Sequence, residues 1–160
     1  MIGLNLKATL AGVTDLGFVD SPADSFEFTF KIQCTSCREI HANPVRINQY
    51  ETHEMHGSRG EANFVFRCKM CKRESSATLK TTNKKYTIED SGKDVRMVEI
   101  DARGLDVVEF IPVGKFSAKG AETTTKFEEV ELEDGEWYDY DEKANEEVSI
   151  TDASWSFAKV

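Results

Sequence analysis

Proline, cysteine and long apolar runs are all scarce in this chain of 160 residues. It contains three prolines and four cysteines, and no cysteine follows Cys71. No run of about 18 apolar residues occurs, so we expect no membrane-spanning helix. The first twelve residues alternate apolar and polar side chains and lack the apolar block of a secretory signal peptide. Helical periodicity is equally poor, and residues 141–146 are the best short helix candidate.

Familiar catalytic motifs are also missing. The chain has no G-x-S-x-G, no G-x-x-x-x-G-K-[ST] and no G-x-G-x-x-G. His53 and His56 lie three residues apart, which is not the spacing of the H-E-x-x-H zinc motif. We interpret both, and His41, as polar loop residues, with a weak second metal site as the alternative. The sequence therefore predicts a protein that is not an enzyme.

Acidic side chains outnumber basic ones by 29 to 20, which gives a formal charge of −9. This balance argues against a general nucleic-acid-binding protein and against binding to anionic membranes. Residues 1–92 carry 12 basic and 11 acidic side chains, whereas residues 93–160 carry 8 and 18. The densest acidic run, residues 128–147, is interrupted by Trp137, Tyr138 and Tyr140. It is either a solvated face or a docking surface for a basic partner.

Alternating apolar residues indicate strands along most of the chain. Phe26, Phe28, Phe30 and Ile32 share one parity and lead into Cys34, and a second alternating segment leads into Cys68. Further alternating segments lie around residues 98–102, 108–112, 127–132, 148–150 and 155–157. Glycine, Ser-Pro and Asn-Pro signals punctuate them. These patterns predict an all-β sandwich or barrel-like fold.

The charge distribution suggests two lobes: a β lobe over residues 1–92, which holds all four cysteines, and an acidic β lobe over residues 93–160. A short internal similarity links residues 6–13 with residues 97–105, since each is an alternating strand, a glycine and an aliphatic residue. Duplication of one β unit and chance resemblance both remain open. We expect two similar, sandwich-like lobes packed as one unit, with intertwining as an open alternative.

The four cysteines form two C-x-x-C pairs, Cys34 with Cys37 and Cys68 with Cys71, thirty residues apart. Each pair follows a predicted strand, so two turns could face each other and present four sulfurs to one ion. Four thiolates close the coordination sphere of zinc and leave no position for water, which indicates one structural Zn²⁺. Basic residues flank the pairs and would offset the negative charge: Arg38, Arg67, Lys69, Lys72 and Arg73.

Three other uses of the cysteines fit the sequence less well. A disulfide framework needs an oxidising compartment, for which no secretory signal is seen. A redox-active C-x-x-C needs a helix N-terminus, and no helical pattern follows either pair. An iron–sulfur cluster uses the same ligands but usually a different spacing. Zinc is favoured over all three.

Taken together, these motifs resemble the eukaryotic CXXC motif-containing zinc-binding protein family. The resemblance rests on the segment 4–10, both C-x-x-C pairs, Gly-x-Arg-Gly-x-Ala at 57–62, Arg-Gly-Leu at 103–105 and the run 137–144. It implies a compact all-β protein of two similar lobes with one zinc ion on Cys34, Cys37, Cys68 and Cys71. The family offers no catalytic residues to transfer.

We therefore expect a zinc-binding, non-enzymatic protein-interaction module that works as a monomer in the cytoplasm, or also in the nucleus. Its partner would be a protein that binds the acidic segment from Trp137 to Lys143. The alternatives are an enzyme, by analogy with sulfoxide reductases that carry two C-x-x-C pairs, and a GTPase-exchange or chaperone factor on a zinc β fold. Nucleic-acid binding near the cysteines is a further alternative that the overall charge opposes.

Overall fold

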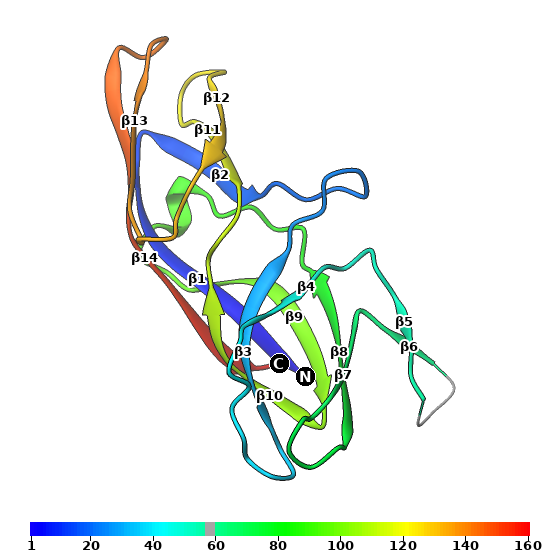
Figure 1. The fold of residues 1–160 in the computed structure, drawn as a ribbon. Helices are drawn as coiled ribbons and strands as arrows, with labels where there is room; N and C mark the ends of the chain where they lie inside the picture. The colour runs from blue at the N-terminus through cyan, green and yellow to red at the C-terminus, as the bar shows by residue number, and fades with distance from the viewer. Residues whose placement is uncertain (57–59) are drawn as a thin grey trace.

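Antiparallel strands make up nearly all of the computed structural model, which describes residues 1–56 and 60–160 (Figure 1). The strands are β1 (Ile2–Ala11), β2 (Val13–Phe18), β3 (Phe28–Cys34), β4 (Val45–Ile47), β5 (His53–Glu54), β6 (Glu61–Ala62), β7 (Phe64–Arg67), β8 (Glu74–Thr81), β9 (Val95–Arg103), β10 (Leu105–Ile111), β11 (Phe116–Gly120), β12 (Lys126–Val130), β13 (Trp137–Asp141) and β14 (Glu146–Lys159). A single 3-10 turn, η1 (Ile88–Asp90), is the one helical element in the described ranges. The prediction of an all-β fold is confirmed. Residues 57–59 of the Gly-x-Arg-Gly-x-Ala motif lie outside the described residues.

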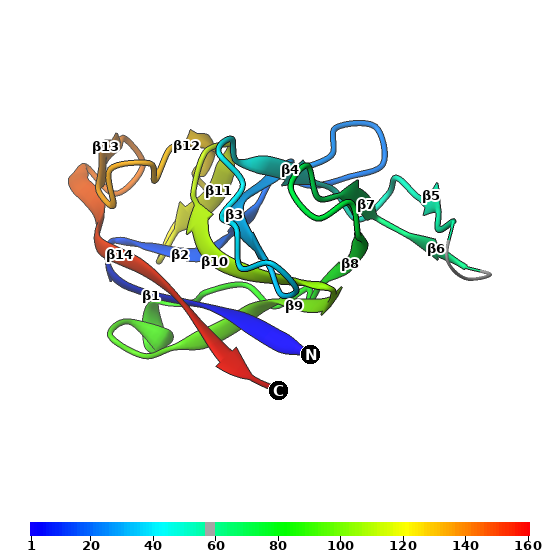
Figure 2. The same ribbon diagram turned by 60° about the horizontal axis from the view of Figure 1, so that its bottom comes forward.

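One large sheet forms the back of the molecule, with the strand order β13-β14-β1-β9-β8-β7. Two three-stranded sheets, β10-β3-β4 and β12-β11-β2, pack near it, and β5 pairs with β6. The first strand lies at the centre of the large sheet, where Ile2 pairs with both Lys159 of β14 and Ile100 of β9. The two chain ends therefore lie side by side, as Figures 1 and 2 show.

The strand order is symmetric about the β1–β9 pair. β1 continues through Gly12 into β2, and β9 continues through Gly104 into β10. Both glycines have left-handed φ angles, +73° and +82°, and these turn the chain from the large sheet into a small one. A Cβ atom on Gly12 would lie 2.7 Å from Val148 Cγ1, so the close approach also requires glycine. The internal similarity seen in the sequence thus corresponds to a structural repeat.

Each lobe combines strands from both sides of residue 92. The cysteine lobe contains β3, β4, β7, β8, β9 and β10, and the acidic lobe contains β1, β2, β11, β12, β13 and β14. Each lobe therefore receives its glycine-linked strand pair from the other half of the chain (Figure 2). The division at residue 92 falls between the two sequence repeats, and as a domain boundary it stays a prediction.

Local irregularities explain where the periodic pattern misled. Residues 141–146, the best helix candidate in the sequence, form the tight turn between β13 and β14. The segments around residues 150 and 155 are a single strand, β14, in which Asp152 adopts a left-handed φ of +54°. In β10 the register shifts between Val107 and Glu109, so Val107 is buried and Val108 is exposed.

The core lies between the large sheet and the two small ones. Buried aliphatic residues of β1 and β9 meet aromatic rings from β2, β3, β10, β11 and β14: Phe18, Phe28, Phe110, Phe116 and Trp155. The fully buried Tyr86, in the connection between the repeats, accepts a hydrogen bond from the Ala8 N–H and has its hydroxyl within 3.1 Å of three carbonyl oxygens. Within the described ranges, no helix has the length and apolar character needed to cross a membrane.

Candidate metal centre

Two turns of the same shape carry the four cysteines. Cys34 ends β3 and Cys68 directly follows β7, so each first cysteine leaves a strand. The Arg38 N–H donates to the Cys34 carbonyl at 3.0 Å, and the Lys72 N–H donates to the Cys68 carbonyl at 2.9 Å. Arg38 and Lys72 also share a left-handed φ, of +65° and +66°. We call these turns, residues 34–38 and 68–72, the two knuckles.

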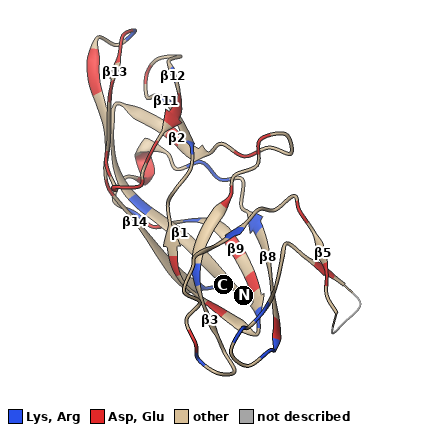
Figure 3. Ribbon diagram, in the orientation of Figure 1, with Lys and Arg blue, Asp and Glu red and all other residues tan. Residues whose placement is uncertain are grey.

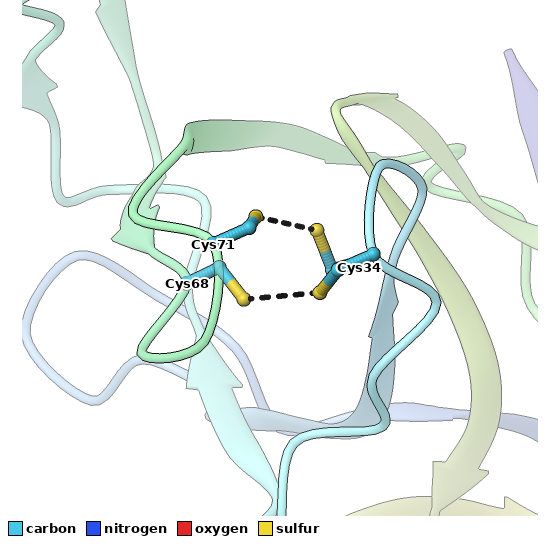
Figure 4. Close-up of side chains that lie close together, drawn as sticks. Cys34, Cys68 and Cys71 are labelled. Carbon is cyan, nitrogen blue, oxygen red and sulfur yellow. Dashed lines mark hydrogen bonds between the residues drawn. The ribbon is translucent and has the colours of Figure 1, made fainter.

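The knuckles face each other and bring their sulfurs together (Figure 4). The Sγ atoms of Cys34 and Cys71 are 3.6 Å apart, as are those of Cys37 and Cys68, and all four lie within 4.8 Å of one another. Zinc–sulfur bonds of about 2.3 Å in a tetrahedron separate the sulfurs by about 3.8 Å, whereas a disulfide needs about 2.05 Å. The donor set therefore fits one tetrahedral zinc ion, and the cysteines are not disulfide-bonded.

The thiols are polarised unevenly by the turns. Backbone N–H groups of Cys37 and Ser36, in that order, lower the pKa of Cys34 to about 6, against the effect of burial. In the second knuckle, the N–H groups of Cys71 and Met70 likewise lower the pKa of Cys68. The backbone N–H of Glu39 acts in the same direction on Cys37, but burial and the neighbouring sulfurs outweigh it and raise the pKa of Cys37 to about 12. Four thiolates cannot share this space without a cation, which a zinc ion would supply.

Basic side chains surround the knuckles, as the sequence suggested. Arg67 Nη1 donates to the Lys72 carbonyl at 3.2 Å and braces the second knuckle. Arg38 forms an ion pair of 3.6 Å with Asp106, and the side chains of both residues are more than half exposed. Figure 3 shows blue segments at the β7–β8 turn, with red segments among them. The positive charge of these basic side chains offsets the negative charge of a zinc ion bound by four thiolates.

A small apolar cavity beside the metal centre was not foreseen from the sequence. Ile40 and Met70, both more than half exposed, lie at its edge, and Phe66 and Leu105 form part of its wall. Cys34 and Cys68 also line it, so the cavity adjoins the sulfurs. The sequence offers no clear signal for this cavity, since Met70 within the second C-x-x-C pair is marked only by its exposure in the fold.

The histidines do not join the metal centre. In the described part of the chain the four cysteines are the one group of side chains placed to hold a metal ion. The His41 ring packs edge-on against Phe66, and its Nδ1 lies 2.6 Å from the Asn43 carbonyl oxygen. His56 Nδ1 lies 2.9 Å from Glu74 Oε1, and His53 Nε2 lies 3.9 Å from Glu51 Oε2.

The acidic segment around Trp137 lies at the opposite end of the molecule from the metal centre. It forms β13, which is one of the two edge strands of the large sheet, and the turn into β14 (Figures 1 and 3). We call residues 136–147 the acidic hairpin. Trp137 packs against Phe127 with ring centroids 5.2 Å apart, whereas Tyr138 and Tyr140 point outward. The negative charge of Glu136 raises the pKa of the Tyr138 phenol, and Asp152 adds a smaller effect in the same direction.

Sequence reasoning also missed a buried carboxylate in the acidic hairpin. Asp141 is 1% exposed and accepts hydrogen bonds of 2.6 Å from both Thr123 and Thr125, which lie in the β11–β12 loop. These donors lower the pKa of Asp141, so it is ionised at neutral pH. In the sequence it is one acid among many in the run 128–147, and no local signal distinguishes it.

Comparison with known proteins finds relatives whose names refer to a CXXC motif and to zinc binding. The model of the family "CXXC motif containing zinc binding protein, eukaryotic" matches residues 3–158. The human protein named "CXXC motif containing zinc binding protein" is 38% identical over 159 residues, which cover 99% of this chain and 98% of the human one. A UPF0587 protein of Schizosaccharomyces pombe is 46% identical over 156 residues, covering 98% of this chain and 96% of that protein.

Two solved structures share the fold. The crystal structure titled C1orf123 is 37% identical, covers 99% of both chains and superposes with a TM-score of 0.89. A hypothetical protein from Plasmodium falciparum, 22% identical with 98% of each chain covered, superposes with a TM-score of 0.85 and supports the fold alone.

Proposed function

We propose two roles for this chain, which belongs to the eukaryotic family of CXXC motif containing zinc binding proteins. One zinc ion joins its two knuckles, and its acidic hairpin binds a basic segment of a partner protein. The zinc has a scaffolding role, and the protein is an interaction module rather than an enzyme. The observation that carries the second part is the exposed aromatic and acidic edge of β13.

The structural role of the zinc follows from the number of its ligands. Four cysteine sulfurs lie within 4.8 Å of one another, so no position at the ion remains for water or substrate. A catalytic zinc needs such an open position. The ion would instead join β3 to the β7–β8 turn, which belong to different sheets.

The acidic hairpin supplies three properties of a docking surface. Tyr138 and Tyr140 are 65% and 44% exposed, and aromatic rings such as these are enriched in the contact surfaces of protein complexes. They line a shallow groove with Asp139 and Glu147. Carboxylates and aromatic faces together favour Arg and Lys side chains, by ion pairing and by cation–π contact.

The test compares two variants of equal charge change. In the first, Glu136, Asp139, Glu142 and Glu147 become Gln or Asn; in the second, the exposed Glu128, Glu131, Glu133 and Asp134 do so. We expect an arginine-rich peptide probe to bind wild type and the second variant similarly and to bind the first at least tenfold more weakly. A glutamate-rich peptide is the control and should not bind. Equal loss of binding in both variants would show a general charge effect and overturn the proposal.

The enzymatic alternative has its own measurement. A sulfoxide reductase needs a reactive cysteine, but all four cysteines are committed to the metal centre. We expect no turnover of methionine sulfoxide by the zinc-loaded protein. Turnover that disappears in a cysteine variant would replace the scaffold proposal with an enzymatic one. Acceleration of nucleotide release across a panel of small GTPases would favour the exchange-factor alternative instead.

A further inference from the structure

The two halves of the structural repeat can be aligned residue by residue. Gly12 and Gly104 hold the same place, and the residue after each pairs with the end of a strand. Leu105 pairs with Cys34 of β3, and Val13 pairs with Gly120 of β11. Gly120 in the acidic lobe therefore holds the position that Cys34 holds in the cysteine lobe.

The loops that follow these strands have the same backbone hydrogen bonds. The Cys34 N–H donates to the Glu39 carbonyl at 2.9 Å, and the Gly120 N–H donates to the Thr125 carbonyl at 2.8 Å. One residue later, Thr35 donates to the Gly104 carbonyl at 3.1 Å, and Ala121 donates to the Gly12 carbonyl at 2.9 Å. The spacing is identical, so Thr123 corresponds to Cys37.

The second pair of turns aligns as well. Val65 pairs with Ser76, which pairs with Arg103 next to Gly104. Tyr138 pairs with Ser149, which pairs with Ala11 next to Gly12. Three residues beyond Val65 and Tyr138 stand Cys68 and Asp141, and Ala144 then corresponds to Cys71. The left-handed residue after each turn also matches, Lys72 at +66° and Asn145 at +57°.

At these four positions the acidic lobe contains a clamp of hydrogen bonds. Thr123 Oγ1 donates to Asp141 Oδ2 at 2.6 Å, and this bond joins the same two positions as the 3.6 Å approach of Cys37 and Cys68. Asp141 Oδ1 accepts from Thr125 Oγ1 at 2.6 Å and from the N–H groups of Lys143 and Ala144 at 3.0 and 3.3 Å. A Cβ atom on Gly120 would lie 1.9 Å from Thr123 Oγ1, so the clamp fills the space of a fourth ligand.

We infer that the loop 120–125 and the turn 141–146 are a second pair of knuckles, in which the Asp141 clamp replaces the metal ion. The two pairs share the anchoring backbone hydrogen bonds and differ in what closes the turns. The loop 120–125 departs from its counterpart at Thr124, which does not have the left-handed φ of Arg38. The acidic hairpin is consequently held to its lobe without zinc, whereas the cysteine knuckles depend on it.

The decisive experiment restores the cysteines. The variant Gly120→Cys, Thr123→Cys, Asp141→Cys and Ala144→Cys, purified with excess zinc, is expected to contain two zinc ions per chain where the wild type contains one. A matched control shifts each cysteine by one residue: Ala121→Cys, Thr124→Cys, Glu142→Cys and Asn145→Cys. It is expected to contain one. A folded first variant with one zinc ion would overturn the inference.

A second measurement serves if the four-cysteine variant does not fold. Asp141→Ala is expected to lower the melting temperature by about 5–10 °C, because buried donors lose a charged acceptor, while zinc content stays at one ion per chain. Asp139→Ala, which removes an exposed acid of the same strand, is expected to change it by about 1 °C. Equal shifts in the two variants would overturn the clamp. Neither experiment involves a partner, so the inference and the proposed docking role fail independently.

Discussion

The cysteine lobe and the acidic lobe close the same turns in two ways. In the cysteine lobe four sulfurs converge on a space that suits a dication, and no hydrogen bond between neutral groups could hold ionised thiolates there. In the acidic lobe one buried carboxylate collects two hydroxyl and two backbone donors. The contrast shows that the backbone frame does not by itself require a metal. On the inferred alignment, the side chains at four positions determine whether a lobe depends on zinc.

Loss of one zinc ligand should have the largest effect. Cys68→Ser is expected to abolish stoichiometric zinc binding and to lower the melting temperature by more than about 10 °C, because the knuckles then lose their link. Metal analysis and thermal unfolding followed by circular dichroism measure both.

Removal of zinc by a chelator allows the stabilities of the two lobes to be compared within a single protein. Hydrogen exchange after zinc removal should accelerate in the knuckles, residues 34–38 and 68–72, before it accelerates in the turn 141–146. Simultaneous loss of protection in both places would mean that the two lobes do not differ in their dependence on zinc.

The Asp141 clamp should respond to acid. The pKa of Asp141 is lower in the folded protein than its ordinary value of 3.8, so its contribution to stability is complete above that pH and is lost as the pH falls through the folded value. Asp141→Asn is expected to melt about 5 °C below wild type at pH 7, with the difference shrinking below pH 3.8. A difference that stays constant from pH 7 to pH 3 would show that the charge of Asp141 does not matter.

A smaller effect, common to both lobes, is expected at Tyr86. Its hydroxyl fastens the connection between the repeats to Ala8 of β1. Tyr86→Phe leaves the Ala8 N–H without its acceptor and should lower the melting temperature by about 3 °C. Zinc-loaded and zinc-free protein should lose the same amount. Unequal falls in melting temperature between the two forms would show that Tyr86 stabilises one lobe and not the connection between them.

The exposed rings of the acidic hairpin should matter least for folding. Tyr138→Ala and Tyr140→Ala are each expected to change the melting temperature by about 1 °C, since neither side chain belongs to the core. Binding of the arginine-rich probe should nevertheless weaken. A large loss of stability would show that these rings support the sheet rather than a partner.

The metal centre could be predicted because its ligands are recognised by the spacing of the cysteines along the chain. Two C-x-x-C pairs, each after an alternating strand, determine that two turns present paired sulfurs, and Phe28 and Phe30 are buried as their parity predicts. Irregular backbone defeated the same reasoning elsewhere. The register shift in β10 moves Val108 outward, and the residues 141–146 form a turn because the chain must reverse there to return as β14.

Asp141 could not be found by such reasoning, since nothing local distinguishes it from Asp139 or Glu142. Its burial depends on threonines of the β11–β12 loop, which the sheet pairing brings to it. The exposed Met70 beside the apolar cavity is a similar case, because a cavity wall comes from several strands at once.

By itself the sequence determined the strand-rich fold, the four cysteines and the acidic character of the second half, because periodicity, spacing and charge are local properties. Only the tertiary structure decided that β1 lies between β9 and β14 and that each lobe contains a strand pair from the other half of the chain. The same pairings place Asp141 at the position in the acidic lobe that corresponds to Cys68 in the cysteine lobe. Those outcomes depend on pairings between residues far apart in the chain, and long-range pairing is set by the shared core rather than by any single segment.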